Sequence, residues 1–180
     1  MVIYQHYRII VCLLWLLLSA VITFAQGYRQ LTEKDFRGTP DNKNPYLSNT
    51  KLRIGYRSST VQKENIFQIK FEVYLDINQN ESWIKFDKIN DQRTLTALLK
   101  HEQGHFKLGA LMQKELTQKL NNKKYTKHYK QEAATIFDRI SQKYELLQLQ
   151  YDQETQHMMD RNQQRLWDKK LDSLLFKTLH

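Results

Sequence analysis

Residues 98–106 read Leu-Leu-Lys-His-Glu-Gln-Gly-His-Phe and contain the pattern His-Glu-x-x-His within a stretch of helical periodicity. His101 and His105 lie four positions apart, so on a helix both imidazoles project from one face and can reach a single metal ion. Glu102 would lie beside that face, where a carboxylate can accept a proton from a water molecule that the metal activates. The pattern is typical of a zinc site with a general base on the same helix.

The polar residues of the motif fall on the apolar face of the predicted helix. At about 100° per residue, His101, Glu102 and His105 lie among leucines and Met112. Buried polar side chains need partners, and a bound cation supplies one. Gly109 would let another element approach the helix one turn beyond His105. The alternative is an amphipathic helix whose histidines are only packed or surface groups.

A catalytic zinc site needs a third protein ligand and an open position for water. Beyond the apolar N-terminus and the motif pair, the chain offers His128, His157 and His180. His128 lies in a basic run and His180 is the last residue, so His157 is the better candidate. Glu154, one helical turn before His157, would be a ligand itself or the partner that orients the imidazole. Tyr151 is a candidate for stabilising an oxyanion, because it lies close to His157 in the sequence.

The segments around the motif predict an α+β fold. Strands are predicted at residues 51–56, 66–77 and 82–86. Helices are predicted from Asp91 or Thr94 to about Leu120, from about Thr126 to Tyr151, and across residues 166–175. A small antiparallel sheet followed by long helices is an α+β layout. We expect it to be zincin-like, with the long helices carrying the metal site.

The N-terminus predicts export. Residues 9–25 are almost wholly apolar and end in a small residue, so we expect a secretory signal peptide at 1–25, or an uncleaved N-terminal anchor. Either one places the protein in the periplasm or outside the cell. Residues 26–50 hold both prolines and are predicted to be irregular, with Leu31 and Phe36 pinning them to the body. Residues 51–180 are expected to form a single α+β metallopeptidase-like domain.

The composition limits which residue types could bind a metal and which classes of partner are expected. Cys12 is the only cysteine, and it lies in the apolar N-terminal run, so any zinc must be held by His, Asp or Glu. The net charge is +9, but the lysines are scattered as on solvated helical faces. No stretch combines aromatic and basic residues as a platform for bases, so we expect no nucleic-acid partner.

Three segments of the chain, in order, resemble a known family. They are Leu31-Thr32 with Asp35-Phe36-Arg37-Gly38-Thr39-Pro40; Ser82-Trp83 with Leu98-Leu99 and the motif to Phe106; and Tyr151-Asp152 with Thr155 and His157. They look like the bacterial predicted secreted zinc-dependent protease family known as domain of unknown function 922. The resemblance implies that His101, His105 and His157 bind Zn²⁺ and that Glu102 is the general base.

We therefore expect an exported zinc-dependent metallohydrolase, a metallopeptidase acting on a peptide or protein substrate. The edge of strand 66–77 would align an extended peptide by main-chain pairing. One alternative is a non-catalytic, zinc-stabilised envelope or binding protein, and another is a metal hydrolase that cleaves a non-peptide bond. Membrane contact is expected only through an uncleaved N-terminal segment, and the sequence is silent on oligomeric state.

Overall fold

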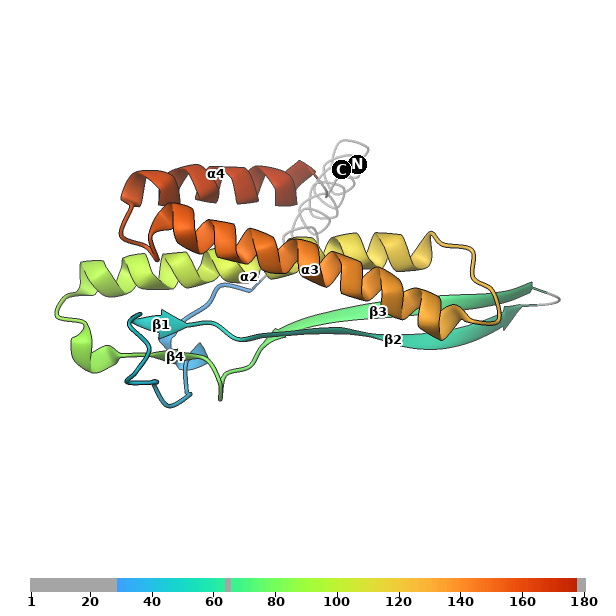
Figure 1. Ribbon diagram of the computed structural model, residues 1–180, viewed down its shortest axis with the longest axis horizontal. Helices are drawn as coiled ribbons and strands as arrows, with labels where there is room; N and C mark the ends of the chain where they lie inside the picture. The colour runs from blue at the N-terminus through green and yellow to red at the C-terminus, as the bar shows by residue number, and fades with distance from the viewer. Residues whose placement is uncertain (1–28, 64–65, 178–180) are drawn as a thin grey trace, which may run out of the picture. The chain divides into compact units, whose positions relative to one another are not determined.

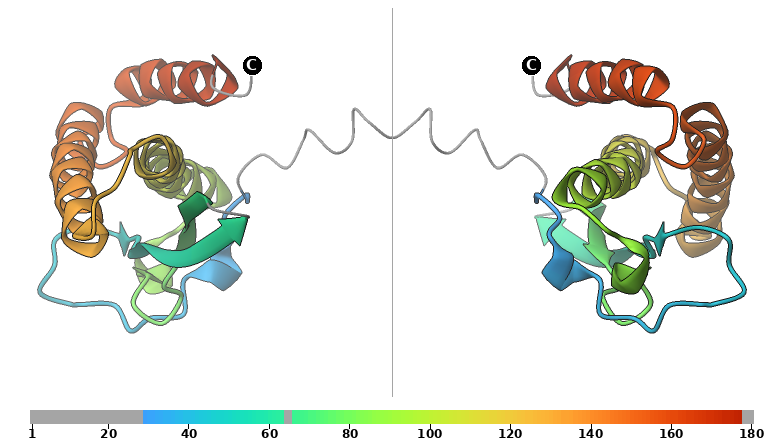
Figure 2. Two further views of the ribbon diagram at one scale, coloured as in Figure 1. Left: turned by 90° about the vertical axis from the view of Figure 1, so that its right-hand side faces the viewer. Right: turned by 90° about the vertical axis from the view of Figure 1, so that its left-hand side faces the viewer.

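The helix that carries the motif is the central element of the fold. The computed structural model describes residues 29–63 and 66–177. Helix α2 (Gln92–Asn121) contacts the strands, α3 (Tyr129–Thr155) and α4 (Arg161–Lys177) (Figure 1). Figure 2 shows the strands and the other two helices arranged around α2. The motif is therefore surrounded by elements that can bring further side chains to it.

Helix α2 begins and ends close to where the sequence predicts. The Asp91 side chain caps it, accepting a hydrogen bond from the backbone N–H of Thr94 at 2.9 Å. At the other end, the Asn121 side chain bonds both backbone groups of Phe71, each at 2.9 Å. The helix end is thus tied to the neighbouring strand.

The strands form two antiparallel pairs rather than the single sheet that the sequence suggested. Strand β1 (Ser48–Asn49) pairs with β4 (Trp83–Ile84), and β2 (Leu52–Lys63) pairs with β3 (Ile66–Ile77). In the longer pair the register runs from Leu52↔Ile77 to Lys63↔Ile66. Within the described residues, two short 3₁₀ helices complete the elements, η1 (Glu33–Asp35) and η2 (Phe86–Lys88). Small antiparallel strands followed by helices confirm the α+β prediction.

Two groups of buried side chains fix the helices in place. One joins β3 to α2 and α3, and it consists of Phe71, Val73, Met112, Leu116, Leu120, Ala133, Ile140 and Tyr144. The other joins α4 to α2 and α3, and it consists of Leu108, Tyr151, Trp167 and Leu171. Burial of this apolar surface is the main stabilising contribution that holds α3 and α4 against the motif helix.

Helices α3 and α4 are separate because the chain turns sharply between them. Gln156, His157 and Met158 have φ values of 48°, 46° and 78°, in the left-handed region that non-glycine residues rarely adopt. Helix α3 therefore ends at Thr155, and the third helical stretch of the sequence is a helix of its own. This turn places His157 outside any helix.

Residues 31–180 form one compact unit, divided from residues 1–30. Leu31 and Phe36 are buried in that unit, as predicted. The predicted signal peptide or anchor, residues 1–25, lies outside the described residues. Among the helices that the structure describes, none is long and apolar enough to cross a membrane.

Candidate metal centre

Helix α2 places the motif side chains in the interior. His101 and Glu102 are each 2% exposed, and the rings of His101 and His105 lie 4.9 Å apart at right angles. Gly104, between the histidines, allows α3 to approach closely, because a Cβ there would lie 2.1 Å from the hydroxyl oxygen of Tyr151. The motif face is thus closed from one side by α3.

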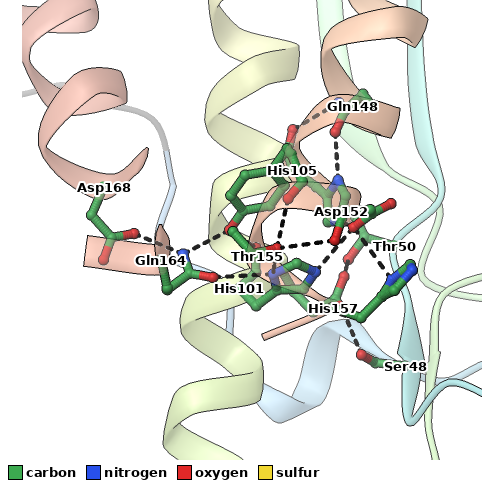
Figure 3. A network of polar contacts seen from close by, with 12 residues as sticks. Ser48, Thr50, His101, His105, Gln148, Asp152, Thr155, His157, Gln164 and Asp168 are labelled. Atoms are coloured by element: carbon green, nitrogen blue, oxygen red, sulfur yellow. Dashed lines mark hydrogen bonds and ion pairs between the residues drawn. The ribbon is translucent and has the colours of Figure 1, made fainter. Parts of the chain in front are cut away.

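Asp152 of α3 is the centre of a group of side chains that also contains His101, His105 and His157. Its Oδ1 atom lies 3.2 Å from Nε2 of His101, 2.9 Å from Nε2 of His105 and 3.5 Å from Nδ1 of His157 (Figure 3). The three imidazole nitrogens therefore face one carboxylate oxygen. The predicted histidines do come together, but around Asp152, which was not among the predicted site residues.

This donor set fits a metal ion. His101, Asp152 and His157 each offer one ligand atom, and these atoms all lie within 4.8 Å of one another. His105 joins the group through its contact with Asp152. Imidazole nitrogen and carboxylate oxygen are ligands that zinc takes in proteins, and other first-row divalent ions accept the same donors. The partly buried His-Asp-His group could therefore bind a metal ion, and its donors do not select one ion.

His157 reaches the group from the turn after α3. Its backbone N–H donates to the carbonyl of Asp152 at 3.0 Å, so the chain folds back over the end of the helix. The ring of Tyr46 stacks on that of His157, with centroids 3.5 Å apart and planes 26° apart. These contacts hold the imidazole at the rim of the group, where the side chain is 33% exposed.

Asp152 and the histidines around it shift one another's pKa values. Burial alone would lower the pKa of His105, but the hydrogen bond to Asp152 and the charge of Glu102 outweigh it and raise that pKa to about 9. Burial would raise the pKa of Asp152, yet hydrogen bonds from His101 and His105 hold it well below its usual range. Burial also lowers the pKa of His157. The site therefore contains an ionised carboxylate that needs positive charge beside it.

The other ring nitrogens of the motif histidines face glutamine side chains. Nδ1 of His101 lies 3.1 Å from Oε1 of Gln164 in α4, and Nδ1 of His105 lies 2.5 Å from Oε1 of Gln148 in α3 (Figure 3). Both rings therefore have one nitrogen directed at a glutamine and the other at Asp152. No motif in the sequence marks either glutamine.

Glu102 lines a cavity together with His101, Asp152 and His157, and its hydrogen bonds come from the segment before β2. Its two carboxylate oxygens accept hydrogen bonds from the hydroxyls of Ser48 and Thr50, the latter at 2.5 Å. The cavity measures about 670 Å³ and is lined by residues 44–52 together with side chains of α2 and α3. Ser48 and Thr50 come from the segment predicted to be irregular, and no spacing or motif indicates their contact with Glu102.

Two of the predicted site residues lie away from this cavity. Tyr151 is fully buried behind His101, and its hydroxyl donates to the His101 carbonyl at 2.9 Å and accepts from Gln164 at 2.8 Å. Its hydroxyl is thus used within the core rather than presented to a substrate. Glu154 is exposed, and its Oε2 accepts from the indole N–H of Trp167 at 2.7 Å. The acid that meets the histidines is Asp152, not Glu154.

The free edge predicted at strand 66–77 is also covered. The backbone groups of Phe71 bond the Asn121 side chain, and the carbonyl of Val73 accepts from Nε2 of Gln113 at 2.9 Å. Both amide side chains belong to α2. This edge of β3 is therefore occupied by the helix and does not offer main-chain groups to a peptide at these positions.

A comparison with protein families matches the part of the chain that contains the three motif segments. The profile of a family described as "Bacterial protein of unknown function (DUF922)" matches residues 22–158. That range takes in α2, α3 and the turn that carries His157, and it ends before α4. No curated protein and no solved structure matches the chain.

Proposed function

The chain belongs to the bacterial DUF922 family, and we propose that it is a zinc-dependent hydrolase that cleaves peptide bonds. The observation that carries this proposal is the position of Glu102, which lines the same cavity as His101, Asp152 and His157. Sets of metal ligands occur in structural sites as well as in catalytic ones. A buried carboxylate beside the group supplies the general base that hydrolysis requires.

The residues that would hold zinc are His101, His105 and His157, because their ring nitrogens all face Oδ1 of Asp152. When bound, the ion would supply Lewis-acid chemistry, polarising a scissile carbonyl and making water more acidic. Asp152 provides the negative charge that balances the cation in a buried site. The partial exposure of His157 leaves the group open toward the cavity.

Glu102 would accept the proton of the attacking water molecule and pass it to the leaving amine. The hydroxyls of Ser48 and Thr50 each donate to a different oxygen of its carboxylate, which fixes the orientation of that group. Each carboxylate oxygen has two acceptor positions, so one position on each remains for a proton in transfer. The base is thus oriented without being blocked.

Strand β1 favours an extended peptide as the substrate. The backbone N–H of Lys85 donates to the carbonyl of Leu47 at 2.8 Å, so this pair is hydrogen-bonded and the next pair, Ser48 and Ile84, is not. The N–H and C=O of Ser48 therefore point away from β4, and Ser48 lines the cavity. These main-chain groups can pair with a peptide whose scissile bond lies near Glu102.

A second candidate function is favoured by Asp152. Four donors, from His101, His105, His157 and Asp152, are enough to close a tetrahedral zinc site, and closed sites are structural. The protein would then be a zinc-stabilised binding or envelope protein without catalysis. The two functions differ in one measurable respect, because only a catalytic site loses hydrolysis when Glu102 is changed.

The decisive experiment compares the wild-type protein with Glu102→Gln. The proposal expects bound zinc in both proteins and hydrolysis of an unfolded protein substrate by the wild type alone. Zinc in both proteins with hydrolysis in neither favours the structural function. Equal hydrolysis by both proteins excludes Glu102 as the base.

We also propose that the protein acts outside the cytoplasm on peptide or protein substrates and binds no nucleic acid. The support for export is the apolar run at residues 9–25. N-terminal sequencing of the protein recovered from the periplasmic fraction tests this, and we expect a chain that begins at Gln26. Recovery of the chain only from the cytoplasm would contradict it.

A further inference from the structure

We propose that Gln164 and Asp168 of helix α4 are positioning residues of the metal site. Gln164 would accept a hydrogen bond from Nδ1 of His101, and Asp168 would orient the Gln164 amide for this contact. The other ring nitrogen, Nε2, is then the one available to the ion. The inference rests on the proposed metal site but not on catalysis. It gives α4, which lies beyond the residues that match the family, a part in binding the metal.

The Gln164 side chain is only 3% exposed and makes three polar contacts. Its Oε1 lies 3.1 Å from Nδ1 of His101. Its Nε2 donates to the hydroxyl of Tyr151 at 2.8 Å and to Oδ1 of Asp168 at 2.9 Å. Every polar atom of this amide therefore has a partner, and each partner lies in a different direction.

Asp168 determines which way the amide faces. An ionised carboxylate only accepts hydrogen bonds, so the NH₂ end of Gln164 must face Asp168. The opposite orientation would bring the amide oxygen against a carboxylate oxygen. The Nζ atom of Lys100 lies 2.8 Å from the other oxygen of this carboxylate, Oδ2 of Asp168. The amide oxygen is consequently left facing His101.

A second acceptor leads to the same conclusion for His101. The hydroxyl of Thr155 donates to the carbonyl of Tyr151 at 2.6 Å, so its proton is already used. The same hydroxyl oxygen lies 3.5 Å from Nδ1 of His101. Two acceptors thus face Nδ1, which must carry a proton to satisfy them. Nε2, which faces Asp152, is then the nitrogen that would be left for a metal ion.

His105 provides a parallel within the same site. The amide nitrogen of Gln148 donates to the carbonyl of His105 at 3.2 Å, which leaves Oε1 facing Nδ1 of that ring. Both motif histidines are therefore arranged to present Nε2 to the site. The two glutamines differ in what orients their amides. Gln148 donates to a backbone carbonyl of α2, whereas Gln164 donates to a carboxylate side chain of α4.

The predicted effect is on metal affinity. Partners that orient ligating histidines typically change metal affinity by about 10- to 100-fold when they are removed. Gln164→Met keeps a similar volume and removes the acceptor, so we expect zinc affinity to fall by about that factor. Asp168→Asn removes one of the two acceptors that hold the NH₂ end of Gln164 and leaves the Tyr151 hydroxyl as the other, so we expect a smaller loss of affinity in the same direction.

Asp172→Asn is the matched control. Asp172 lies one turn beyond Asp168 on α4 and also pairs with a lysine of α2, Lys107, at 2.5 Å. The substitution removes the same charge from the same helix, but Asp172 has no contact with Gln164 among the interactions of the described residues. We expect its zinc affinity to equal that of the wild type.

The test uses the full chain, zinc titration against a chromophoric chelator and ¹⁵N NMR of the imidazoles. The expected result is a His101 that carries a proton on Nδ1 and binds zinc through Nε2, with weaker zinc binding in Gln164→Met. Zinc bound through Nδ1 of His101, or unchanged affinity in a folded Gln164→Met, would overturn the inference. A protein that binds zinc as expected but hydrolyses nothing would contradict the proposed catalysis and leave this inference supported.

Discussion

At the scale of single residues, the site depends on how a few side chains are paired. Asp152 gathers the imidazoles of His101, His105 and His157 around one carboxylate oxygen. Glu102, buried close by, takes its hydrogen bonds from two hydroxyls instead. The two carboxylates therefore have different surroundings, one among imidazole nitrogens and the other between two hydroxyl groups. That difference suits one acid to metal binding and the other to proton transfer.

Thr50 provides a residue-scale prediction for the base. Thr50→Val keeps the shape of the side chain and removes the hydroxyl that donates to Glu102. A hydrogen bond to a charged group is worth about 1.5–3 kcal/mol, so we expect kcat to fall by about 10- to 100-fold with zinc content unchanged. Thr50→Ser is the control, because it keeps the donor and should keep most of the activity. A Thr50→Val protein with the wild-type kcat would show that this hydroxyl does not support the base.

At the scale of elements, α2 is approached closely on two sides through its glycines. Gly104 faces Tyr151 of α3, and Gly109 faces Leu52 and Leu75 of the β2–β3 hairpin. The second approach is the one predicted from the sequence. The two contacts differ in stiffness, since Tyr151 is fully buried and hydrogen-bonded whereas Leu52 is half-buried.

This difference predicts unequal effects of two alanine substitutions. In Gly104→Ala the new Cβ would lie 2.1 Å from the Tyr151 hydroxyl, and in Gly109→Ala it would lie 2.7 Å from a terminal methyl of Leu52. Both changes gain the same helix propensity. We expect Gly104→Ala to lower the free energy of unfolding by about 1–3 kcal/mol more than Gly109→Ala, measured by urea denaturation. Equal stability of the two variants would contradict the proposed rigidity of the α2–α3 contact.

The elements also show how far the sequence could predict the structure. Apolar periodicity and the Asp91 cap located α2 and the face that carries His101 and His105, because both signals are local. The turn at Gln156, His157 and Met158 carries no such signal, since its left-handed residues are not glycines. A continuing helix would have placed Glu154 beside His157. The turn instead brings His157 back over Asp152.

Long-range contacts were the other part that the sequence could not supply. Ser48 and Thr50 meet Glu102 across more than fifty residues of chain. Gln164 meets His101 across an even longer separation. Neither contact follows from spacing or composition, because each depends on how the helices and the segment before β2 pack around α2. The motif therefore identified the histidines that lie around Asp152 but not the side chains that contact them from other elements.

At the scale of the whole molecule, the candidate metal site draws its side chains from three separate segments of the chain. His101 belongs to α2, Asp152 to α3 and His157 to the turn before α4. An ion bound only by the folded protein would stabilise all three against unfolding. The metal would then contribute to stability whether or not the site is catalytic.

Thermal unfolding with and without zinc tests this contribution. A ligand present at one hundred times its Kd stabilises the folded state by about 2.7 kcal/mol. We expect zinc to raise the Tm and a chelator to reverse the increase. His157→Ala should largely abolish the increase, whereas His128→Ala, which changes an exposed histidine ahead of α3, should retain it. An equal increase in both variants would place the bound zinc elsewhere.

The central claim is that Glu102 acts as a general base beside a metal held by the histidines around Asp152. The most direct measurement is zinc content together with hydrolysis of an unfolded protein substrate, for the wild type and for Glu102→Gln. We predict equal zinc content in the two proteins and hydrolysis that falls by at least about 100-fold in the variant, in line with the usual contribution of a general base. A Glu102→Gln protein that retains zinc and hydrolyses the substrate at the wild-type rate would contradict the claim.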